Sequence, residues 1–278
     1  MYHGVAPDGA PALAAQLLYL IRHFKVVSLE AMVDRLTNRS FPLTNEIVLT
    51  FDDGLRNNLT VVYPILRELQ LPATFFVCPA LVESGRWLWN HEMRCRLQTL
   101  AVPELAELRM KLLAPDTSVD GIVEWMKTLR LPQRRQAETT IRQASTDFQP
   151  TASQRAAFDM TDWDDLLSLD RDLITVGSHT LSHPILPTLS AQEIESELVE
   201  SRGCLEQRLQ RTVDFFCYPN GAYDQRAHQL VQKTYRAAVT TESGVVDSLE
   251  EPSLHRLPRI PSAESAALTA WRLHRPEA

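Results

Sequence analysis

Short apolar runs with strand-like composition alternate with helically spaced segments along most of this 278-residue chain, and this alternation constrains the fold more than any other feature. Strand-like runs occupy 25–29, 46–51, 72–79, 173–179, 213–219 and 236–241, and helical spacing occupies 11–24, 29–37, 61–70, 163–169, 190–211 and 224–235. The connections are long enough for crossovers, which favours a mostly parallel sheet with helices outside, open or closed as a barrel. In such folds, active sites lie at the carboxyl ends of the strands.

The alternation is interrupted between about residues 84 and 160, where helical segments follow one another without a strand-like run. A segment of this kind is most simply an insertion into the alternating fold, with charged helices that form a solvated cover. We therefore expect a single domain over residues 1–278 with a helical insertion at about 84–160.

Composition excludes several classes of protein. Hydrophobic residues make up 44% and charged residues 23%, which rules out disorder and low-complexity architecture. The net charge is −7 and no basic stretch stands out, which argues against nucleic acid or an anionic membrane as the main partner. The four cysteines lie far apart without a CxxC pair, so we expect buried free thiols rather than a zinc knuckle or a disulfide scaffold.

The start of the chain favours a cytoplasmic protein. No apolar run reaches the roughly 18 residues of a membrane span, and MYHGVAPDGA lacks the basic start and apolar core of a signal peptide. A barrel strand would be expected to begin before residue 3, so a longer native N-terminus is the alternative.

Polar clusters fall where predicted strands end. They are Tyr2-His3, Asp52-Asp53-Gly54, His179 to His183, and Tyr218-Pro219-Asn220-Gly221. Because the carboxyl ends of neighbouring parallel strands converge on one face, these side chains can meet there although they are far apart in the sequence.

Two of these clusters carry metal-binding chemistry. Asp52 and Asp53 leave the strand in different directions, so one can bind a metal while the other handles a proton. His179 and His183, four residues apart, can both face one cation. With a carboxylate such as Asp53 they supply two nitrogens and one oxygen, which leaves positions open for water and substrate. The alternatives are an Asp-Asp-Gly turn that merely closes the strand and surface histidines around a helix start.

The clusters together resemble the motifs of the metal-dependent polysaccharide deacetylases with a NodB homology domain, carbohydrate esterase family 4. Residues 50–54 match the first motif, TFDDG, in full; residues 179–183 match the second, H(S/T)xxH; and residues 218–221 correspond to the third. The resemblance covers the chain outside the insertion. It implies an α/β fold, a distorted (β/α)7-type barrel with a helical insertion, and a hydrolase that removes N-acetyl groups from a glycan containing N-acetylhexosamine.

The resemblance also implies roles for the motif residues. It makes Asp52 the base, and it makes Asp53, His179 and His183 the ligands of a divalent metal, most simply Zn²⁺. The backbone amide of Tyr218 would help to bind the oxyanion. Asn220, in the same motif, would contact the carbohydrate substrate.

The chain departs from the family pattern in two places. Many members carry an arginine at the start of the third motif as the partner of the base, whereas this chain has Phe216 or Cys217 there. Many members also end with a Leu-x-His motif whose histidine is the general acid. This chain is more similar to the exopolysaccharide and poly-N-acetylglucosamine deacetylase branch, in which a Tyr-His pair on the first strand supplies the acid. His3 is therefore favoured over His255, and Arg259 in an LPRI segment is expected to point into the site and bind substrate.

Aromatic residues at the start of the insertion are candidates for contact with sugar rings. Trp87 and Trp89 are the predicted substrate-binding pair, whereas Trp125, Trp163 and Trp271 are more simply packing residues. Two other functions compete with deacetylation. One is a catalytically inactive glycan-binding member of the same fold, which the missing arginine suggests. The other is an iron oxygenase with two histidines and one carboxylate.

Overall fold

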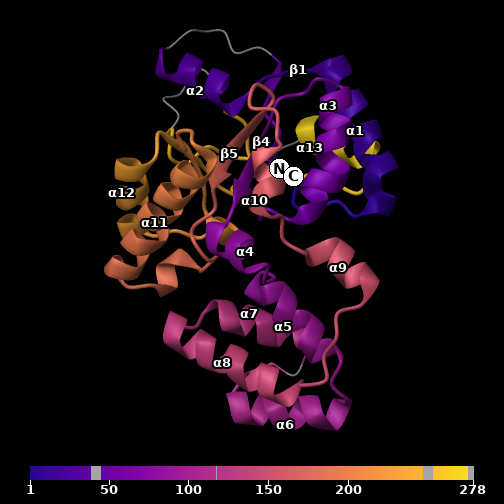
Figure 1. The fold of residues 1–278 in the computed structure, drawn as a ribbon, viewed down its shortest axis with the longest axis vertical. Helices are drawn as coiled ribbons and strands as arrows, with labels where there is room; N and C mark the ends of the chain where they lie inside the picture. Colours follow the sequence, from indigo (N-terminus) through magenta and orange to yellow (C-terminus); the bar gives the residue numbers. More distant parts are fainter. Residues whose placement is uncertain (39–44, 117, 247–252, 275–278) are drawn as a thin grey trace.

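A computed structural model of the chain describes residues 1–38, 45–116, 118–246 and 253–274 (Figure 1). A five-stranded parallel sheet with the strand order β3-β4-β5-β6-β7 forms its centre. The strands are β3 (Thr50–Phe51), β4 (Ala73–Val77), β5 (Ile174–Ser178), β6 (Phe215–Cys217) and β7 (Ala237–Val239). Since all five strands are parallel, their carboxyl ends lie at one edge of the sheet.

Two further extended segments join the edges of the sheet. Tyr2 pairs in parallel with β3, and Leu257 pairs in parallel with β7. The chain after Leu257 then meets the chain start, where the backbone nitrogen of Met1 donates to the carbonyl oxygen of Ile260 at 2.9 Å and that of Ser262 donates to Met1 at 2.9 Å. The curled sheet is thus joined edge to edge, and the expected (β/α)7-type fold is confirmed.

The strand-like run at 25–29 lies outside this sheet. Its first residues, Lys25–Val26 (β1), pair in parallel with Glu46–Ile47 (β2) in a separate two-stranded sheet. The run at 46–51, predicted as one strand, therefore supplies β2 to the small sheet and β3 to the barrel.

Helices cover the outside of the barrel (Figure 1). Apolar side chains of α1 and α3 share one core cluster with Phe51 and Phe75 of the sheet, and burial of one such ring stabilises the fold by about 1.5–3 kcal/mol. The helices are α1 (Ala10–His23), α2 (Leu29–Thr37), α3 (Tyr63–Glu68), α4 (Pro79–Ser84), α10 (Trp163–Leu167), α11 (Ala191–Leu209), α12 (Gln225–Thr234) and α13 (Ala266–His274). None of the helices in the described ranges has both the length and the apolar character that crossing a membrane requires.

The helices between α4 and α10 form a layer below the barrel in the view of Figure 1. They are α5 (Trp89–Gln98), α6 (Val102–Leu112), α7 (Val119–Lys127), α8 (Leu131–Ala144) and α9 (Ala152–Phe158). Their apolar side chains pack around a core of their own, which includes Met93, Ile122 and Ile141, and Ile185 joins it from the loop after β5. The helices α5 to α8 thus bury their apolar faces against one another, whereas α9 contributes no residue to this core.

Candidate metal and catalytic site

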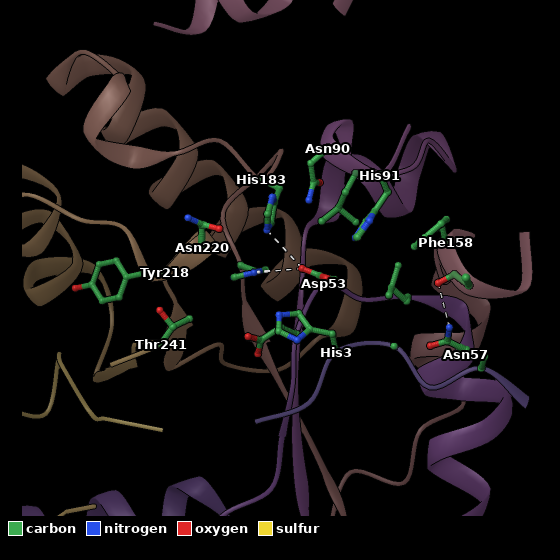
Figure 2. A pocket seen from close by; sticks show the side chains of 17 residues that line it. His3, Asp53, Asn57, Asn90, His91, Phe158, His183, Tyr218, Asn220 and Thr241 are labelled. Carbon is green, nitrogen blue, oxygen red and sulfur yellow. Dashed lines mark hydrogen bonds and ion pairs between the residues drawn. The ribbon is translucent and has the colours of Figure 1, made fainter. Parts of the chain in front are cut away.

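The polar clusters predicted at the strand ends lie together around one pocket of about 610 Å³ (Figure 2). Asp52 and Asp53 follow β3, His179 follows β5, and His3 follows the residue that pairs with β3. All four side chains line the pocket, together with His183. The convergence of strand ends that the sequence predicted is therefore observed.

The backbone has residues in the left-handed conformation both at the Asp-Asp-Gly motif and at the histidine motif. Asp53, Thr180 and His183 have positive φ angles of 77°, 66° and 58°, which cost a non-glycine residue roughly 1–2 kcal/mol each. Gly54 follows with a φ of 71°, and a Cβ there would lie 2.9 Å from a methyl carbon of Val77. Strain of this kind persists only where the surrounding structure enforces it, so these residues are positioned rather than merely connected.

The side chains of Asp53, His179 and His183 converge with a spacing that suits one metal ion. The Oδ1 atom of Asp53 lies 3.5 Å from Nε2 of His179 and 3.4 Å from Nε2 of His183. Two ligands at the usual zinc distances on a tetrahedral ion are roughly 3.4 Å apart, so the donor set fits. Burial alone would raise the pKa of Asp53, but hydrogen bonds with the two histidines hold it well below its usual range. The carboxyl is thus ionised, as a ligand must be.

The tautomer of His179 also fits a ligand role. Its Nδ1 atom lies 2.7 Å from the carbonyl oxygen of Cys217 and therefore carries the proton, which leaves Nε2 free to bind a cation. In contrast, Nδ1 of His183 is buried and has no hydrogen-bond partner among the described residues. A second buried group also has ligand atoms close enough together to share one metal ion; it consists of Asp52, His179 and Cys217. It fits less well because the Asp52 carboxylate is already occupied by a cationic side chain.

That side chain is Arg259, which corrects two predictions. Its guanidinium donates two hydrogen bonds of 2.7 Å to the two oxygens of Asp52 and another of 3.1 Å to Thr50, and all three residues are buried. Arg259 was predicted to bind substrate, but it does not line the pocket. The arginine missing from the third motif is instead supplied from the segment after β7, which meets Asp52 because the barrel joins its edges.

Arg259 also sets the charge state of Asp52. Burial would raise the pKa of this carboxyl, but the charge and the hydrogen bonds of Arg259 outweigh burial and lower the pKa to about 2. The Sγ atom of Cys217 lies 3.1 Å from the guanidinium and 3.4 Å from the carboxylate, so one of the two residues considered for the usual arginine position packs against the pair. Asp52 is consequently ionised and fixed in orientation.

The two candidates for the general acid occupy different places. His3 is exposed and lines the pocket, and its ring lies near the carboxylates of Asp52 and Asp53 (Figure 2). His255 does not line the pocket, and its Nε2 atom lies 2.9 Å from the carbonyl oxygen of Tyr235. Geometry therefore places only His3 where a substrate can reach it.

The third motif also reaches the pocket. Figure 2 shows the ring of Tyr218 directed away from Asp53, and its hydroxyl group donates to the carbonyl oxygen of His255 at 3.2 Å. The backbone amide of Tyr218, predicted to bind the oxyanion, lies 3.3 Å from the carbonyl oxygen of Val239 and makes a long sheet hydrogen bond. Asn220 lines the pocket with a φ of 56°, and its Oδ1 atom accepts from Lys127 of the insertion at 3.3 Å.

The tryptophans predicted to contact sugar rings lie outside the pocket. Trp87 and Trp89 are only 9% and 6% exposed, and neither lines the cavity. The indole of Trp87 donates to Asp159 at 2.8 Å, and that of Trp89 donates to the carbonyl oxygen of His183 at 3.2 Å. The structure therefore gives both side chains supporting contacts and does not place them where a sugar ring in the pocket could stack on them.

Other pocket residues were missed by the sequence reasoning. Asn57, Asn90 and Phe158 line the cavity, and the last two belong to the helical layer, which was interpreted as a cover. His91, which was noted at the rim without a role, also lines it. The only available signal was that Asn90 and His91 stand beside the tryptophans that were chosen.

A curled parallel barrel with a convergent Asp-His-His cluster and an arginine-paired carboxylate defines a class of α/β proteins with a candidate metal centre. Comparison with protein-family models identifies the family: the model described as polysaccharide deacetylase matches residues 42–238. The chain therefore belongs to the polysaccharide deacetylase family, hydrolases that act on N-acetyl amide bonds.

Individual relatives agree with this assignment. YxkH of Bacillus subtilis (strain 168) is 29% identical over 100 residues, a match that covers 35% of this chain and 36% of that protein. The solved structure of the deacetylase PplD of Streptococcus pyogenes, in complex with acetate, has a TM-score of 0.63 at 19% identity and covers 96% of this chain and 93% of its own. IcaB from Ammonifex degensii has a TM-score of 0.63 at 18% identity, with coverages of 97% and 94%. These two structures share the fold of this chain. The family match, and not this likeness, argues against the oxygenase alternative.

Proposed function

We propose that the protein hydrolyses N-acetyl groups of an N-acetylhexosamine-containing glycan and releases acetate. The observation that carries the proposal is that an ionised Asp52, fixed by Arg259, lines the same pocket as the Asp53, His179 and His183 cluster. Family membership supports the reaction class, and the intact site gives no support to a catalytically inactive protein. The exopolysaccharide branch is the branch that we favour.

Asp53, His179 and His183 would hold a divalent cation, for which zinc is the simplest candidate because two imidazoles and one carboxylate suit it. Such an ion supplies a Lewis acid and lowers the pKa of bound water toward about 7. The carbonyl of Cys217 fixes the tautomer of His179 that this role requires.

Asp52 would accept the proton of the attacking water. A carboxylate whose pKa is about 2 is a weak base, so it suits a water molecule that has already been made acidic rather than bulk water. The bidentate contact with Arg259 keeps one orientation of the carboxylate, which lowers the cost of positioning it during the reaction.

His3 would protonate the leaving amine. It is exposed at the pocket wall opposite the helical layer, within reach of a substrate that enters from solvent. The amide of Tyr218, predicted to donate to the oxyanion, would have to give up its long hydrogen bond to Val239 to do so. The pocket volume falls in the range of about 300–1,000 Å³ that small-molecule sites occupy, so it has room for a sugar unit with its acetamido group.

Acetate release from chitooligosaccharides and from poly-N-acetylglucosamine fragments tests the proposal. Asp52→Asn should keep the bound metal but lose at least 100-fold in kcat, the usual contribution of a general base. His179→Ala should lose the metal itself, as measured by elemental analysis. Asp172→Asn and His23→Ala, two exposed positions outside the pocket, serve as matched controls. Wild-type turnover by Asp52→Asn would show that the role of this residue is wrong.

A further inference from the structure

One wall of the pocket belongs to the helical layer and not to the barrel. Three consecutive residues at the start of α5 have different contacts. The indole of Trp89 donates to the carbonyl oxygen of His183, whereas Asn90 and His91 line the cavity (Figure 2). The Trp89 indole is held in place by Arg134 of α8, whose guanidinium carbon lies 4.7 Å from the ring centre. The start of α5 is therefore anchored on both sides.

The side chain of Asn90 lines the pocket and carries one hydrogen-bonding atom without a partner in the described ranges. Its Oδ1 atom is buried and has no hydrogen-bond partner within the described ranges. An asparagine side chain can donate two hydrogen bonds and accept two, and a buried polar atom left without a partner is unfavourable. Because Oδ1 is buried while Asn90 lines the pocket, the amide nitrogen is the group of this side chain that can donate to a ligand in the cavity.

An aromatic pair stands next to Asn90. The rings of His91 and Phe158 are stacked, with centroids 4.4 Å apart and an interplanar angle of 16°. The ring of Phe158 also packs edge to face on Trp87 at 5.5 Å. A flat, braced pair of this kind offers a surface for the apolar face of a pyranose ring.

The segment that carries Phe158 is fixed to the barrel. The side-chain amide of Asn57 donates to the carbonyl oxygens of Ala156 and Ala157 at 3.1 and 3.2 Å, directly before Phe158. The backbone nitrogen of Arg56 donates to the carbonyl oxygen of Asp159 at 2.8 Å, directly after it. The aromatic surface is thus preorganised, which reduces the entropy that binding must cost.

The wall is also uncharged. Burial lowers the pKa of His91 to about 4, so its ring is neutral near pH 7. Lysine and arginine are absent from the described residues that line the pocket, and Lys127 at the rim is paired with Glu124 at 2.8 Å and Asn220 at 3.3 Å. These features suit a neutral, hydroxyl-bearing ring rather than an anionic sugar.

We propose that Asn90 and the stacked His91–Phe158 pair form the subsite that binds the uncharged sugar ring carrying the acetamido group, so that the helical insertion determines substrate recognition while the barrel carries the reaction. This inference rests on the proposed function. It makes Asn90 a specificity-determining residue with no part in holding the metal.

The test compares Asn90→Ala and Phe158→Ala with Gln98→Ala, an exposed position on the same helix as Asn90 and outside the pocket. For acetate release from N-acetylchitotetraose, we expect KM to rise about three- to tenfold in Asn90→Ala, the effect of one neutral hydrogen bond, with kcat within about twofold and an unchanged metal content. Gln98→Ala should match the wild type. A KM within twofold of the wild type in both Asn90→Ala and Phe158→Ala would overturn the subsite, as would a loss of metal in Asn90→Ala.

A direct binding measurement separates this inference from the proposed function. Calorimetric titration of the wild type with the same tetrasaccharide does not require turnover. If the wild type binds it without releasing acetate, and Asn90→Ala weakens binding, the subsite stands and the deacetylase proposal fails. If acetate is released at wild-type KM by both pocket variants, the deacetylase proposal stands and the subsite fails.

Discussion

The pair formed by Asp52 and Arg259 should contribute strongly to stability as well as to the site. The two side chains are 3% and 5% exposed and share two hydrogen bonds of 2.7 Å. Removing the cation alone, as in Arg259→Met, leaves a buried carboxylate without its partner, which costs about 3–5 kcal/mol. The total free energy of unfolding of a domain is only about 5–15 kcal/mol, so the loss should be plain in urea titrations.

A double-mutant cycle tests the physical reason. Asp52→Asn removes the charge from the other side, and the variant with both changes leaves no unpaired charge in the interior. We therefore expect the double variant to be at least about 2 kcal/mol more stable than the sum of the two single losses predicts. Losses that add within about 0.5 kcal/mol would refute the reasoning, because they would mean that the two groups stabilise the fold independently.

Arg256 provides the matched control for this cycle. It lies three residues before Arg259, but it is about half exposed and pairs with Glu242 at 3.3 Å. An exposed pair of this kind contributes only about 0–1 kcal/mol, so Arg256→Met should change the unfolding free energy by less than about 1 kcal/mol. A loss as large as that of Arg259→Met would show that the segment, and not the buried pair, is responsible.

Three further changes probe the supports of the site. Glu197→Gln should weaken metal binding by about tenfold or more in a metal titration, because the buried carboxylate accepts two hydrogen bonds, of 2.6 and 2.9 Å, from the loop between the two histidines. The exposed variant Glu195→Gln is the control. Equal metal affinities of Glu197→Gln and the wild type would contradict this role of Glu197. Gly221→Ala should cost about 2–5 kcal/mol in urea titrations, since φ is 66° and a Cβ would lie 1.8 Å from a side-chain oxygen; an unchanged midpoint would contradict this. His91→Phe should reduce the loss of unfolding free energy between pH 6.5 and 4. Burial lowers the pKa of His91 in the folded chain to about 4, so the unfolded chain binds the proton first as the pH falls. The contribution of the neutral His91 to stability is therefore fully present only above about pH 6.5. Identical pH profiles for the wild type and this variant would refute the assignment.

Periodicity and motif spacing predicted the barrel and its active face because both depend on short-range patterns. Asp52 and His179 follow two parallel strands that are separated by a single strand, so both lie at the same edge of the sheet whatever the loops between them do. The division of 46–51 between two sheets was not predictable, because the same apolar run is compatible with either partner.

Long-range partners within the site could not be predicted in the same way. Arg259 reaches Asp52 across 207 positions because the two edges of the sheet are joined, and no local pattern records that closure. The motif comparison located an arginine where this chain has none, although the geometry needs only a guanidinium at that point in space. Trp89 was misassigned for a related reason: an aromatic residue at a predicted rim can point inward or outward, and only packing decides which.

The strained backbone explains why the helical layer is more than a cover. Positive φ angles at Asp53, Thr180 and His183 together cost roughly 3–6 kcal/mol, and the contacts that offset this cost come from separate elements. Glu197 of α11 accepts two hydrogen bonds from the loop, whereas the indole of Trp89, on α5, donates to the carbonyl oxygen of His183. Part of this support thus comes from the helical layer. The start of α5 therefore serves the site in two separate ways: Trp89 braces a histidine of the metal cluster, and the next two residues, Asn90 and His91, line the pocket.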